Sequence, residues 1–473
     1  MQSIGDAVQW QPTESVSLIM NSPTVSATSD AAAGPSTVTN CDVLVIGGGP
    51  AGSTAAALLA ERGYRVTVLE KARHPRFHIG ESLLPANMPL FDKLGVAAEV
   101  KVIGMEKWGA QFNSPWHAHV QTVEFGQALD KSQPMAYQVK RAQFDEILLR
   151  NASRKNAQVI EGCEAQGVTF LPRSAGVVDE AQHEGGRDER FRAKFLIDAS
   201  GRDTFLGNRL KVKQRNTAHN SAALYGHFSG AERSTGKTEG DISLFWFEHG
   251  WFWFIPLPDG VTSVGAVAWP HYFKTRKGKS LDQFLLETIA LSPKLQARLS
   301  TAQLVSPAEA TGNYSYVCDR TRGENYLLLG DAYTFIDPVF SSGVLFAMQS
   351  AFAGADAVDA CLRKAQRAAS ALRHFDKTMR LGPKVFTWFI YRVTNPALRN
   401  LLMTPNHRLQ LQATILSILA GDIYGATRIR SRLIIFKAAY YIASLFNLRR
   451  TWNAMRARKL NILSVDNSGP VSN

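Results

Sequence analysis

The stretch Cys41-Asp-Val-Leu-Val-Ile-Gly-Gly-Gly-Pro-Ala-Gly52 decides the fold of this chain. Its first half is a short apolar run that predicts a buried strand, and its glycines at positions 47, 49 and 52 precede a predicted helix over 53–62. A second predicted strand, Tyr64–Leu69, ends at Glu70, 23 positions after Gly47. Strand, glycine turn, helix, strand and acid in this order predict a dinucleotide-binding βαβ unit.

Each glycine of the turn has its own physical reason. Gly47 permits a tight turn, Gly49 lets the backbone approach a pyrophosphate, and Gly52 lets the helix pack closely against the strand. The N-terminus of the helix, which follows Ala51 and Gly52, directs unpaired N–H groups and the positive end of the helix dipole at the phosphates. We therefore also expect Ala51 to contact the cofactor. We expect Glu70 to accept hydrogen bonds from both ribose hydroxyls, which disfavours a 2′-phosphate.

Length and composition are those of an enzyme with room for a cofactor. The 473 residues exceed what one core usually supports, and 45% hydrophobic with 20% charged residues is ordinary for a globular protein. The four cysteines are widely scattered and form no C-x-x-C pair. We therefore expect reduced thiols and neither a metal site nor a disulfide framework.

The predicted fold class is α/β, with a Rossmann-like domain assembled from discontinuous pieces. Further strands are predicted before Gly201 and Gly330, which places the core over 41–380. A mostly antiparallel sheet domain is predicted as an insertion over about 215–320, because residues 243–268 are rich in aromatic and β-branched side chains. Residues 381–473 are predicted to be helical, with helices over 409–420 and 433–446, and residues 1–40 to be a disordered tail.

The formal net charge of +13 is unevenly placed. No acidic residue lies between Asp422 and Asp466, whereas nine basic residues do: Arg428, Arg430, Arg432, Lys437, Arg449, Arg450, Arg456, Arg458 and Lys459. This segment could dock an acidic acyl-carrier protein, attach to an anionic membrane face by burying Leu433, Phe436 and Tyr440, or be a solvated surface. With no signal peptide or spanning segment, we expect a cytoplasmic protein, at most peripheral to a membrane, and no nucleic-acid partner.

Three segments resemble the FAD contacts of the p-hydroxybenzoate hydroxylase fold. They are the Gly47–Gly52 turn, Asp198-Ala-Ser-Gly201 and Gly330-Asp331. Arg141, within Val139–Asp145, is similar to the arginine of that fold's helix near the flavin. The resemblance covers about residues 40–380 and implies FAD as cofactor, with Arg141 and Asp331 in contact with it.

Two further motifs are similar to those of the flavin-dependent halogenases. Gly250-Trp-Phe-Trp-Phe-Ile-Pro256 resembles their W-x-W-x-I-P signature, and Phe335-Ile-Asp-Pro-Val-Phe-Ser-Ser-Gly343 resembles their F-x-x-P-x-x-S-x-G pattern. Gly80-Glu-Ser-Leu-Leu-Pro85 looks like their loop over the flavin. The resemblance implies that Trp251 and Trp253 separate substrate from flavin, and that backbone amides of Ser342 and Gly343 bind chloride or bromide. The alternatives are a buried sheet core for the tryptophans and a plain helix cap for the serines.

Lys107 is the residue that the resemblance makes catalytic. It lies in Glu106-Lys-Trp-Gly-Ala-Gln-Phe112, where halogenases of this type place their essential lysine, although an arbitrary lysine is usually a solvated surface residue. FADH2 and oxygen would convert halide to hypohalous acid, which is indiscriminate when free. An ammonium can orient that acid, or a neutral amine can trap it as a haloamine, and burial that lowers the lysine pKa favours the second course.

One departure narrows the expected substrate. Phe340 stands where free-tryptophan halogenases carry a glutamate, so the phenol and pyrrole branch, including enzymes acting on carrier-tethered acyl groups, is the closer resemblance. No second glycine fingerprint for NAD(P)H is present, which implies FADH2 supplied by a separate flavin reductase. The alternatives are an aromatic hydroxylase or geranylgeranyl-reductase-like enzyme of the same fold, and a non-catalytic flavoprotein that docks through its basic C-terminal segment.

Overall fold

The computed structural model describes residues 38–172, 176–312, 315–404, 411–425 and 429–463. Of the predicted N-terminal tail, residues 1–37 lie outside the described residues. Residues 38–40 instead begin the first strand, β1 (Val38–Ile46). The predicted helix after the glycine turn is α1 (Pro50–Glu61), and the predicted second strand is β2 (Val66–Glu70).

A seven-stranded sheet contains this βαβ unit. Its order is β7-β2-β1-β10-β9-β8, with β19 also paired to β10. The pairs among β7, β2, β1, β10 and β19 are parallel, and β8 and β9 extend the sheet antiparallel. The remaining bounds are β7 Gln158–Glu161, β8 Cys163–Phe170, β9 Val177–His183, β10 Asp188–Asp198 and β19 Tyr326–Leu328. Segments far apart in the chain therefore complete one sheet, and the discontinuous Rossmann-like domain is confirmed.

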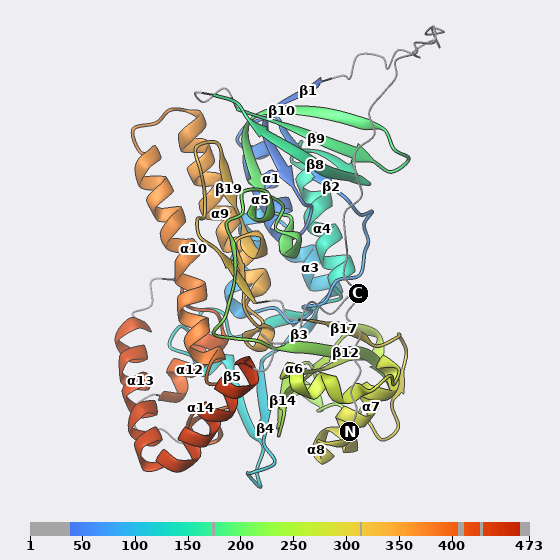
Figure 1. Cartoon of the computed structure of the whole chain (residues 1–473), viewed down its shortest axis with the longest axis vertical. Helices are drawn as coiled ribbons and strands as arrows, with labels where there is room; N and C mark the ends of the chain where they lie inside the picture. The colour runs from blue at the N-terminus through green and yellow to red at the C-terminus, as the bar shows by residue number, and fades with distance from the viewer. Residues whose placement is uncertain (1–37, 173–175, 313–314, 405–410, 426–428, 464–473) are drawn as a thin grey trace, which may run out of the picture. The chain divides into compact units, whose positions relative to one another are not determined.

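Helix α1 is buried on every side. It packs against α4 (Arg141–Arg154) and α9 (Gly343–Leu362), and only its last residue, Glu61, is exposed. Its run of Ala and Gly suits this place, because small side chains allow neighbouring backbones to approach. Figure 1 shows α1 and α9 beside the sheet, with α10 (Ala368–Ile390) along the outer side of α9.

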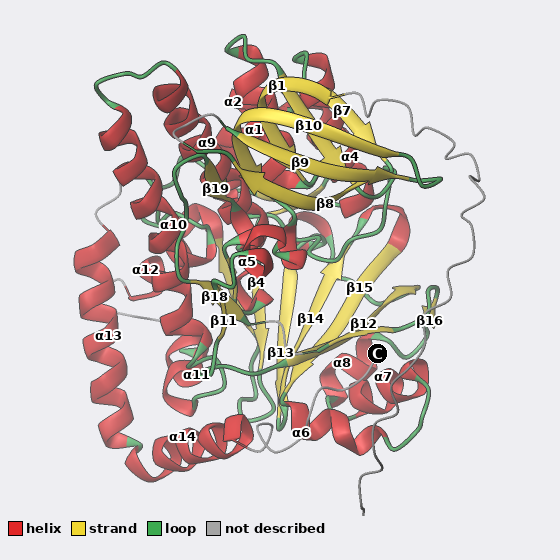
Figure 2. Ribbon diagram, turned by 45° about the horizontal axis from the view of Figure 1, so that its top comes forward, coloured by secondary structure: helices red, strands yellow, loops and turns green. Residues whose placement is uncertain are grey.

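The second sheet has eight strands in the order β16-β12-β15-β14-β13-β4-β5, with β17 also paired to β12. All pairs are antiparallel except β13 with β4. The bounds are β4 Gly109–Asn113, β5 Gln121–Glu124, β12 Ala222–Ser229, β13 Ile242–Phe247, β14 Gly250–Pro256, β15 Val261–Ala268, β16 Gln303–Leu304 and β17 Glu309–Thr311. Two strands thus come from residues 109–124, well before the predicted insertion, because β4 adds to the free edge of β13 (Figure 2).

Alternation along β14 divides the aromatic residues of this sheet between two cores. Phe252 and Phe254 face α6 (Pro270–Phe273), α7 (Leu281–Ala290) and α8 (Pro293–Arg298). Trp251 and Trp253 point to the other face, toward a core shared with the C-terminal helices. Such alternation is what successive side chains of a strand must show.

Shorter elements connect these layers. They are α2 Met88–Leu94, α3 Ala97–Ile103, α5 Phe205–Arg209, β3 Met105–Lys107, β6 Ala136–Gln138, β11 Lys213–Arg215, β18 Tyr316–Cys318 and β20 Thr334–Phe335. Strands β3 and β6 pair antiparallel, and β11, β18 and β20 form a small sheet of their own.

The C-terminal region is helical, as predicted. It contains α11 (Pro396–Met403), α12 (Leu411–Leu419), α13 (Ile429–Phe446) and α14 (Leu448–Leu463), whereas residue 380, the predicted boundary, falls inside α10. Within the described ranges, no helix is both long and apolar enough to cross a bilayer. The face predicted to lie on a membrane is wrong: Leu433, Phe436 and Tyr440 are buried, and the rings of Phe436 and Tyr440 pack against Trp388 at 6.2 and 5.1 Å.

Candidate active site

A single cavity of about 1270 Å³ connects the two sheets. Its wall includes the glycine turn and residues 69–72 on one side, strands β12 to β14 on the other, and the segment 329–347 between them. The volume exceeds the roughly 300–1,000 Å³ of an ordinary small-molecule site. It therefore has room for a dinucleotide and a second molecule.

The glycine turn is built as the sequence indicates. Gly47 has φ +99°, and a Cβ there would lie 2.4 Å from the carbonyl oxygen of Ala199. A Cβ on Gly52 would lie 1.9 Å from the carbonyl oxygen of Gly47, so helix and strand meet through the missing side chain. At Gly49, by contrast, the nearest atom to a Cβ is Nη2 of Arg76 at 3.9 Å. Gly49 and Ala51 line the cavity, so the open space at Gly49 suits a ligand that approaches the backbone.

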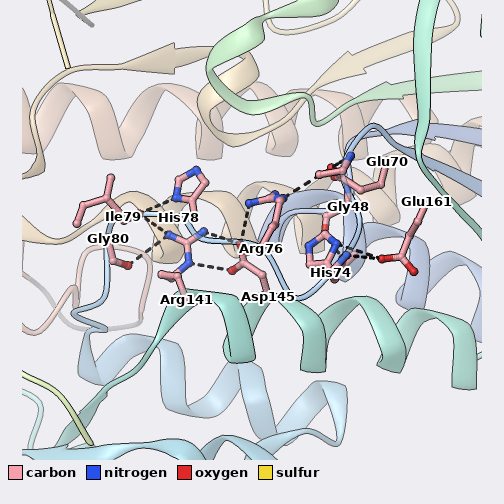
Figure 3. A network of polar contacts seen from close by, with 12 residues as sticks. Gly48, Glu70, His74, Arg76, His78, Ile79, Gly80, Arg141, Asp145 and Glu161 are labelled. Carbon is pink, nitrogen blue, oxygen red and sulfur yellow. Dashed lines mark hydrogen bonds and ion pairs between the residues drawn. The ribbon is translucent and has the colours of Figure 1, made fainter. Parts of the chain in front are cut away.

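Glu70 lies at the end of β2, beside the glycine turn. Its carboxylate accepts hydrogen bonds from the N–H groups of Gly48 at 2.6 Å and Ala72 at 2.9 Å, and it forms an ion pair with Arg76 at 3.7 Å (Figure 3). Glu70 is 4% exposed and lines the cavity. The carboxylate is thus fixed at the position where a ribose of a bound dinucleotide is expected.

Arg141, the first residue of α4, joins that helix to the loop over the cavity. It forms a bidentate pair with the buried Asp145, at 2.8 and 3.0 Å, and donates to the carbonyl oxygens of Ile79 and Gly80 at 3.0 and 3.3 Å (Figure 3). Burial alone would raise the pKa of Asp145, but the guanidinium holds that pKa below its usual value. Arg141 lines the cavity. Its contacts fix the loop 79–80, which is a structural role additional to the predicted flavin contact.

Asp331 follows β19 and lines the cavity beside Ala347 of α9. Burial raises the pKa of its carboxyl to about 6, against the opposing charges of Arg202 and Arg141. A carboxylate in such a place gains from hydroxyl groups that donate to it. Asp331 therefore suits the polyhydroxyl chain of a flavin cofactor.

Lys107 does not line the cavity. It is the last residue of β3, is 1% exposed, and donates hydrogen bonds of 2.9 Å to the hydroxyl of Ser82 and to the carbonyl oxygen of Leu83. Ser82 itself lines the cavity. The lysine therefore stands directly behind the loop 80–85, and its amine reaches the cavity through Ser82.

Burial lowers the pKa of Lys107 to about 7. The nearby carboxylate of Asp241 opposes that shift, but its Oδ1 accepts the N–H groups of Trp108 and Gly109 at 2.9 and 2.7 Å. The ring of Phe125 lies 5.2 Å from the amine. Near neutral pH the side chain is therefore divided between ammonium and neutral amine.

Trp251 and Trp253 both form part of the cavity wall. Their rings are 6.1 Å apart, and the indole N–H of Trp253 donates to Ser263 at 3.1 Å. A Cβ on Gly265 would lie 2.2 Å from the ring of Trp253, so the glycine makes room for the indole. Both residues also belong to a buried core, so the packing role and the barrier role predicted for them are compatible.

The segment that ends in Ser342 and Gly343 lines the cavity at the start of α9. Ser342 is the N-cap residue without a side-chain cap, and a Cβ on Gly343 would meet nothing within 4 Å. The first N–H groups of a helix have no partner within it, so they are available to an anion. Ser342 thus stands at the cap position of the helix-cap alternative, but its side chain makes no capping hydrogen bond. The predicted halide contact stays a prediction.

A buried cluster that the sequence did not reveal fixes this segment. Asp337 accepts hydrogen bonds from Val339 N–H at 3.1 Å and from the hydroxyl of Ser221 at 2.9 Å, and it contacts Nε2 of His219 at 3.0 Å. Asp337 and Val339 fall inside the motif 335–343. His219 and Ser221 come from the segment before β12, and no local pattern links them to it.

Two other polar residues of the wall were also missed. Glu81 and Nε2 of His227 are hydrogen-bonded at 2.9 Å, and the hydroxyl of Tyr225 donates to Glu309 at 2.8 Å. Both Glu81 and Tyr225 line the cavity. The position of Glu81 inside the Gly80–Pro85 motif was the one available signal.

Phe340 is 8% exposed and packs against the rings of Phe386 and Phe389, each at 5.8 Å. It is absent from the cavity wall, which its neighbours Val339 and Ser341 line. Phe340 therefore belongs to an apolar core and does not face the cavity.

Comparisons with known proteins agree with this geometry. The family model for an FAD binding domain matches residues 40–374. The chain is 32% identical over 415 residues to the 1H-pyrrole-2-carbonyl-peptidyl-carrier protein chlorinase of Pseudomonas fluorescens, covering 82% of this chain and 90% of that protein. It is 34% identical over 344 residues to a flavin-dependent halogenase of Armillaria mellea, covering 68% of each chain.

Solved structures are similar over most of the chain. The myxobacterial chondrochloren halogenase superposes with a TM-score of 0.71 at 30% identity, covering 86% of this chain and 97% of that one. A flavoprotein/dehydrogenase from Cytophaga hutchinsonii superposes with a TM-score of 0.78 at 26% identity, covering 86% and 100%.

Proposed function

Because the chain belongs to the flavin-dependent halogenases of the FAD-binding fold, we propose that it transfers chlorine or bromine to a phenolic or pyrrolic carbon by way of Lys107. One observation carries the proposal. A fully buried lysine, with its pKa lowered to about 7, donates a hydrogen bond to Ser82 at the wall of a cavity that has room for FAD and a substrate.

The flavin end of the cavity is defined by the residues that fit the cofactor. The Gly47–Gly52 turn, which includes Ala51, would hold the pyrophosphate. Glu70 would bind the ribose and Asp331 the polyhydroxyl chain, while Arg141 fixes the loop 79–80 over the cavity. Reduced FAD, when bound, would supply, together with oxygen, the oxidising equivalents that convert halide to hypohalous acid. The backbone N–H groups of Ser342 and Gly343 would hold the halide, because the small side chains there let an anion approach.

Lys107 would control where the oxidised halogen goes. In its neutral form the amine attacks hypohalous acid, forms a nitrogen–halogen bond and releases water. The aromatic carbon then takes the halogen from nitrogen, and the ring proton that is lost returns to the amine. In its ammonium form the lysine would instead hydrogen-bond the hypohalous acid and orient it. The lowered pKa favours the first course, since a neutral amine is well populated near pH 7.

The substrate end of the cavity favours an aromatic substrate that is not a free amino acid. Its wall is formed by Trp251, Trp253, Tyr225 and apolar residues of α10 such as Phe386 and Ile390. No carboxylate stands at position 340 to bind an amino group. We infer a phenol or a pyrrole, presented as an acyl group on a carrier protein. The similarity to a chlorinase of a carrier-bound pyrrole supports this class.

Two protein partners follow from this chemistry. A flavin reductase supplies FADH2, because the chain has one glycine fingerprint and that one opens the FAD unit. An acyl-carrier protein would present a tethered substrate. The basic segment from Arg428 to Lys459 could serve that carrier or an anionic membrane, which is a separate question from the chemistry of the cavity.

Mass spectrometry of product mixtures tests the function. The purified protein is incubated with FAD, a flavin reductase, NADH, oxygen, chloride or bromide, and phenolic and pyrrolic acyl groups, both carrier-bound and as small thioesters. We expect a product that carries the halogen supplied. An oxygenated product that is independent of halide would instead identify an aromatic hydroxylase, and a saturated product a reductase. Flavin binding without any product would favour the non-catalytic docking alternative.

A salt series separates the tethered substrate from the free one. If an acidic carrier docks on basic residues, turnover of the tethered acyl group falls steeply between low and physiological ionic strength. Turnover of the same group as a small thioester should hardly change. Equal salt dependence of the two substrates would show that carrier docking is not electrostatic.

A further inference from the structure

Large exposed apolar side chains are concentrated on α13 and α14. Of the nineteen large hydrophobic residues that are exposed in the described part of the chain, ten lie between positions 434 and 460. They are Ile434, Ile435, Tyr441, Ile442, Leu445, Phe446, Leu448, Trp452, Met455 and Leu460. Phe446 is 88% exposed, and Ile434, Leu445 and Trp452 are each more than 60% exposed. A concentration of exposed apolar side chains on two successive helices usually marks a binding face.

Helix α13 is apolar on two opposite faces. Its inner stripe, with Phe436 and Tyr440, packs on α10, and the spacing of four, three and four residues along Ile429, Leu433, Phe436 and Tyr440 keeps it on one side. At 100° per residue, the stripes through Ile434 and Leu445 and through Ile435, Ile442 and Phe446 lie on the far side. Tyr441 is partly exposed, but its ring lies 6.4 Å from that of Trp388 and its hydroxyl accepts a hydrogen bond from Arg392. Helix α14 continues this pattern with Leu448, Trp452 and Met455, spaced four and three residues apart.

Positive charge borders the apolar surface. Arg430, Arg449, Arg450, Arg456 and Lys459 are exposed, and no acidic residue lies between Asp422 and Asp466. Arg428 lies outside the described residues. Arg458 serves the fold instead: its guanidinium lies 4.5 Å from the ring centre of Tyr391 and donates to the carbonyl oxygen of Ala218.

We propose that α13 and α14 dock the protein on an anionic lipid surface. The protruding apolar side chains would enter the boundary between headgroups and acyl chains, and the arginines around them would contact the phosphates. Trp452, which is 67% exposed, is the kind of residue that favours this depth. No described helix can cross the bilayer, so the contact is peripheral. Figures 1 and 2 both show α13 at the outer edge of the described chain, with α14 next to it.

Charge and shape distinguish lipid from other occupants. A second copy of the chain, facing this surface across a two-fold axis, would bring two sets of arginines together without an acidic residue between them. An acidic carrier protein would account for the charges but would leave the protruding side chains of Ile434, Leu445 and Phe446 without a purpose. An anionic membrane accounts for both features.

Vesicle co-sedimentation of the FAD-loaded full-length protein tests the proposal. The probes are vesicles of equal parts phosphatidylcholine and phosphatidylglycerol, with pure phosphatidylcholine vesicles as the comparison. We expect sedimentation with the anionic vesicles at low salt and release at high salt. The double variant Leu445→Ser, Phe446→Ser removes apolar contact, and Arg449→Glu with Arg456→Glu reverses charge. Each pair should lower the vesicle partition coefficient by roughly tenfold or more.

Matched controls keep the result specific. Val102→Ser, at an 86% exposed position of α3, removes an exposed apolar side chain elsewhere and should leave vesicle binding unchanged. None of the substituted positions is among the described residues that line the cavity, the last of which is Ile390. All these variants should therefore turn over a small soluble substrate at the normal rate. That readout shows that the variant proteins are folded.

Three outcomes overturn the proposal. The first is absence of the protein from the anionic vesicle pellet at low salt. The second is normal vesicle binding by the Leu445→Ser, Phe446→Ser variant, which would place the contact elsewhere. The third is loss of carrier binding or of self-association in these variants without any vesicle binding by the wild type, which would assign the surface to a protein partner.

Discussion

The amine of Lys107 donates a hydrogen bond to the hydroxyl of Ser82 over 2.9 Å, and Ser82, not Lys107, forms the wall of the cavity. The lysine is therefore shielded from the flavin site by one hydroxyl and by the loop 80–85. A reactive halogen species that crosses the cavity meets Ser82 before it meets the amine.

Replacing Lys107 by methionine removes the nitrogen and keeps the volume of the buried side chain. We expect Lys107→Met to bind FAD normally and to continue oxidising FADH2, while halogenated product falls by roughly 10² to 10⁴-fold. The control is Lys101→Met, at an exposed lysine of α3, which should behave as wild type. Near-normal product yield from Lys107→Met would remove the lysine from the mechanism.

The pKa of Lys107, about 7, gives the two possible roles opposite pH dependences. If the neutral amine traps the halogen, product formed per FADH2 oxidised rises as pH increases through 7. If the ammonium orients hypohalous acid, the same ratio falls. The yield per FADH2 is the quantity to measure, because it cancels pH effects on flavin oxidation itself. A flat ratio that does not change between wild type and Lys107→Met would contradict both roles.

The same pKa predicts a stability effect with a definite sign. The pKa of Lys107 in the folded protein lies below that of an unfolded lysine, so the unfolded chain binds more protons than the folded chain between about pH 7 and pH 10. The free energy of unfolding therefore rises with pH over this range, and the cost of burying the lysine is largest below about pH 7. Lys107→Met should therefore raise Tm more at pH 6 than at pH 9. An equal change in Tm at both pH values would mean that the lysine keeps an ordinary pKa in the folded state.

Substitutions at two glycines should separate cofactor binding from folding. A side chain at Gly49 enters open space in the cavity, so Gly49→Val should leave the Tm of the apoprotein nearly unchanged but prevent FAD from binding. A side chain at Gly52 would collide with the backbone of Gly47, so Gly52→Val should destabilise the apoprotein by roughly 3 kcal/mol or more. Flavin absorbance and thermal melts measure both. Yellow, stoichiometric Gly49→Val protein would refute the predicted pyrophosphate contact.

Affinity for FAD should depend on pH through Asp331. Its carboxyl has a pKa raised to about 6, and hydroxyl groups of the cofactor are expected to donate to the ionised form. The affinity for FAD should therefore rise as pH increases through 6, and Asp331→Asn should bind more weakly with that pH dependence removed. Titration of the apoprotein by flavin fluorescence at pH 5 and pH 8 measures it. A wild type with equal affinity at both pH values would rule out this contact.

Asp179 offers a test of stability away from the site. It is fully buried in β9, neither carboxylate oxygen has a hydrogen-bond partner among the described residues, and burial raises its pKa to about 8. At pH 7 the unfolded chain loses a proton that the folded chain keeps, which penalises folding above the ordinary pKa of an aspartate. Asp179→Asn should stabilise the protein by roughly 1–3 kcal/mol at pH 7 and by much less at pH 4. Urea unfolding at the two pH values decides it.

Local patterns were sufficient wherever neighbours in the chain are neighbours in space. The strand, turn and helix around Gly47 interact within thirty residues, so their geometry follows from the residues themselves. Alternation along a strand likewise placed Trp251 and Trp253 on one face. The long C-terminal helices were also predictable in kind.

Orientation was not predictable in the same way. Helix α13 carries apolar residues around most of its circumference. One of the three interpretations of the sequence made Leu433, Phe436 and Tyr440 a membrane-facing side. The structure buries all three, and Phe436 and Tyr440 pack against the aromatic surface that Trp388 and Phe389 of α10 provide. Which apolar face of such a helix turns inward depends on a partner element that lies far outside the helix in the sequence.

The sequence by itself determined the dinucleotide-binding βαβ unit, its glycine turn and the sign of the C-terminal charge, since each follows from residue type and short-range spacing. The FAD cofactor and the role of Lys107 were predicted from the resemblance of the motifs to a known family. Only the tertiary structure decided that Lys107 is buried behind Ser82, that Asp337 is held by His219 and Ser221, and that strands from residues 109–124 complete the second sheet. The physical reason is common to all three. Burial, hydrogen-bond partners and pKa depend on which distant segments pack together, and that packing is a property of the whole folded chain.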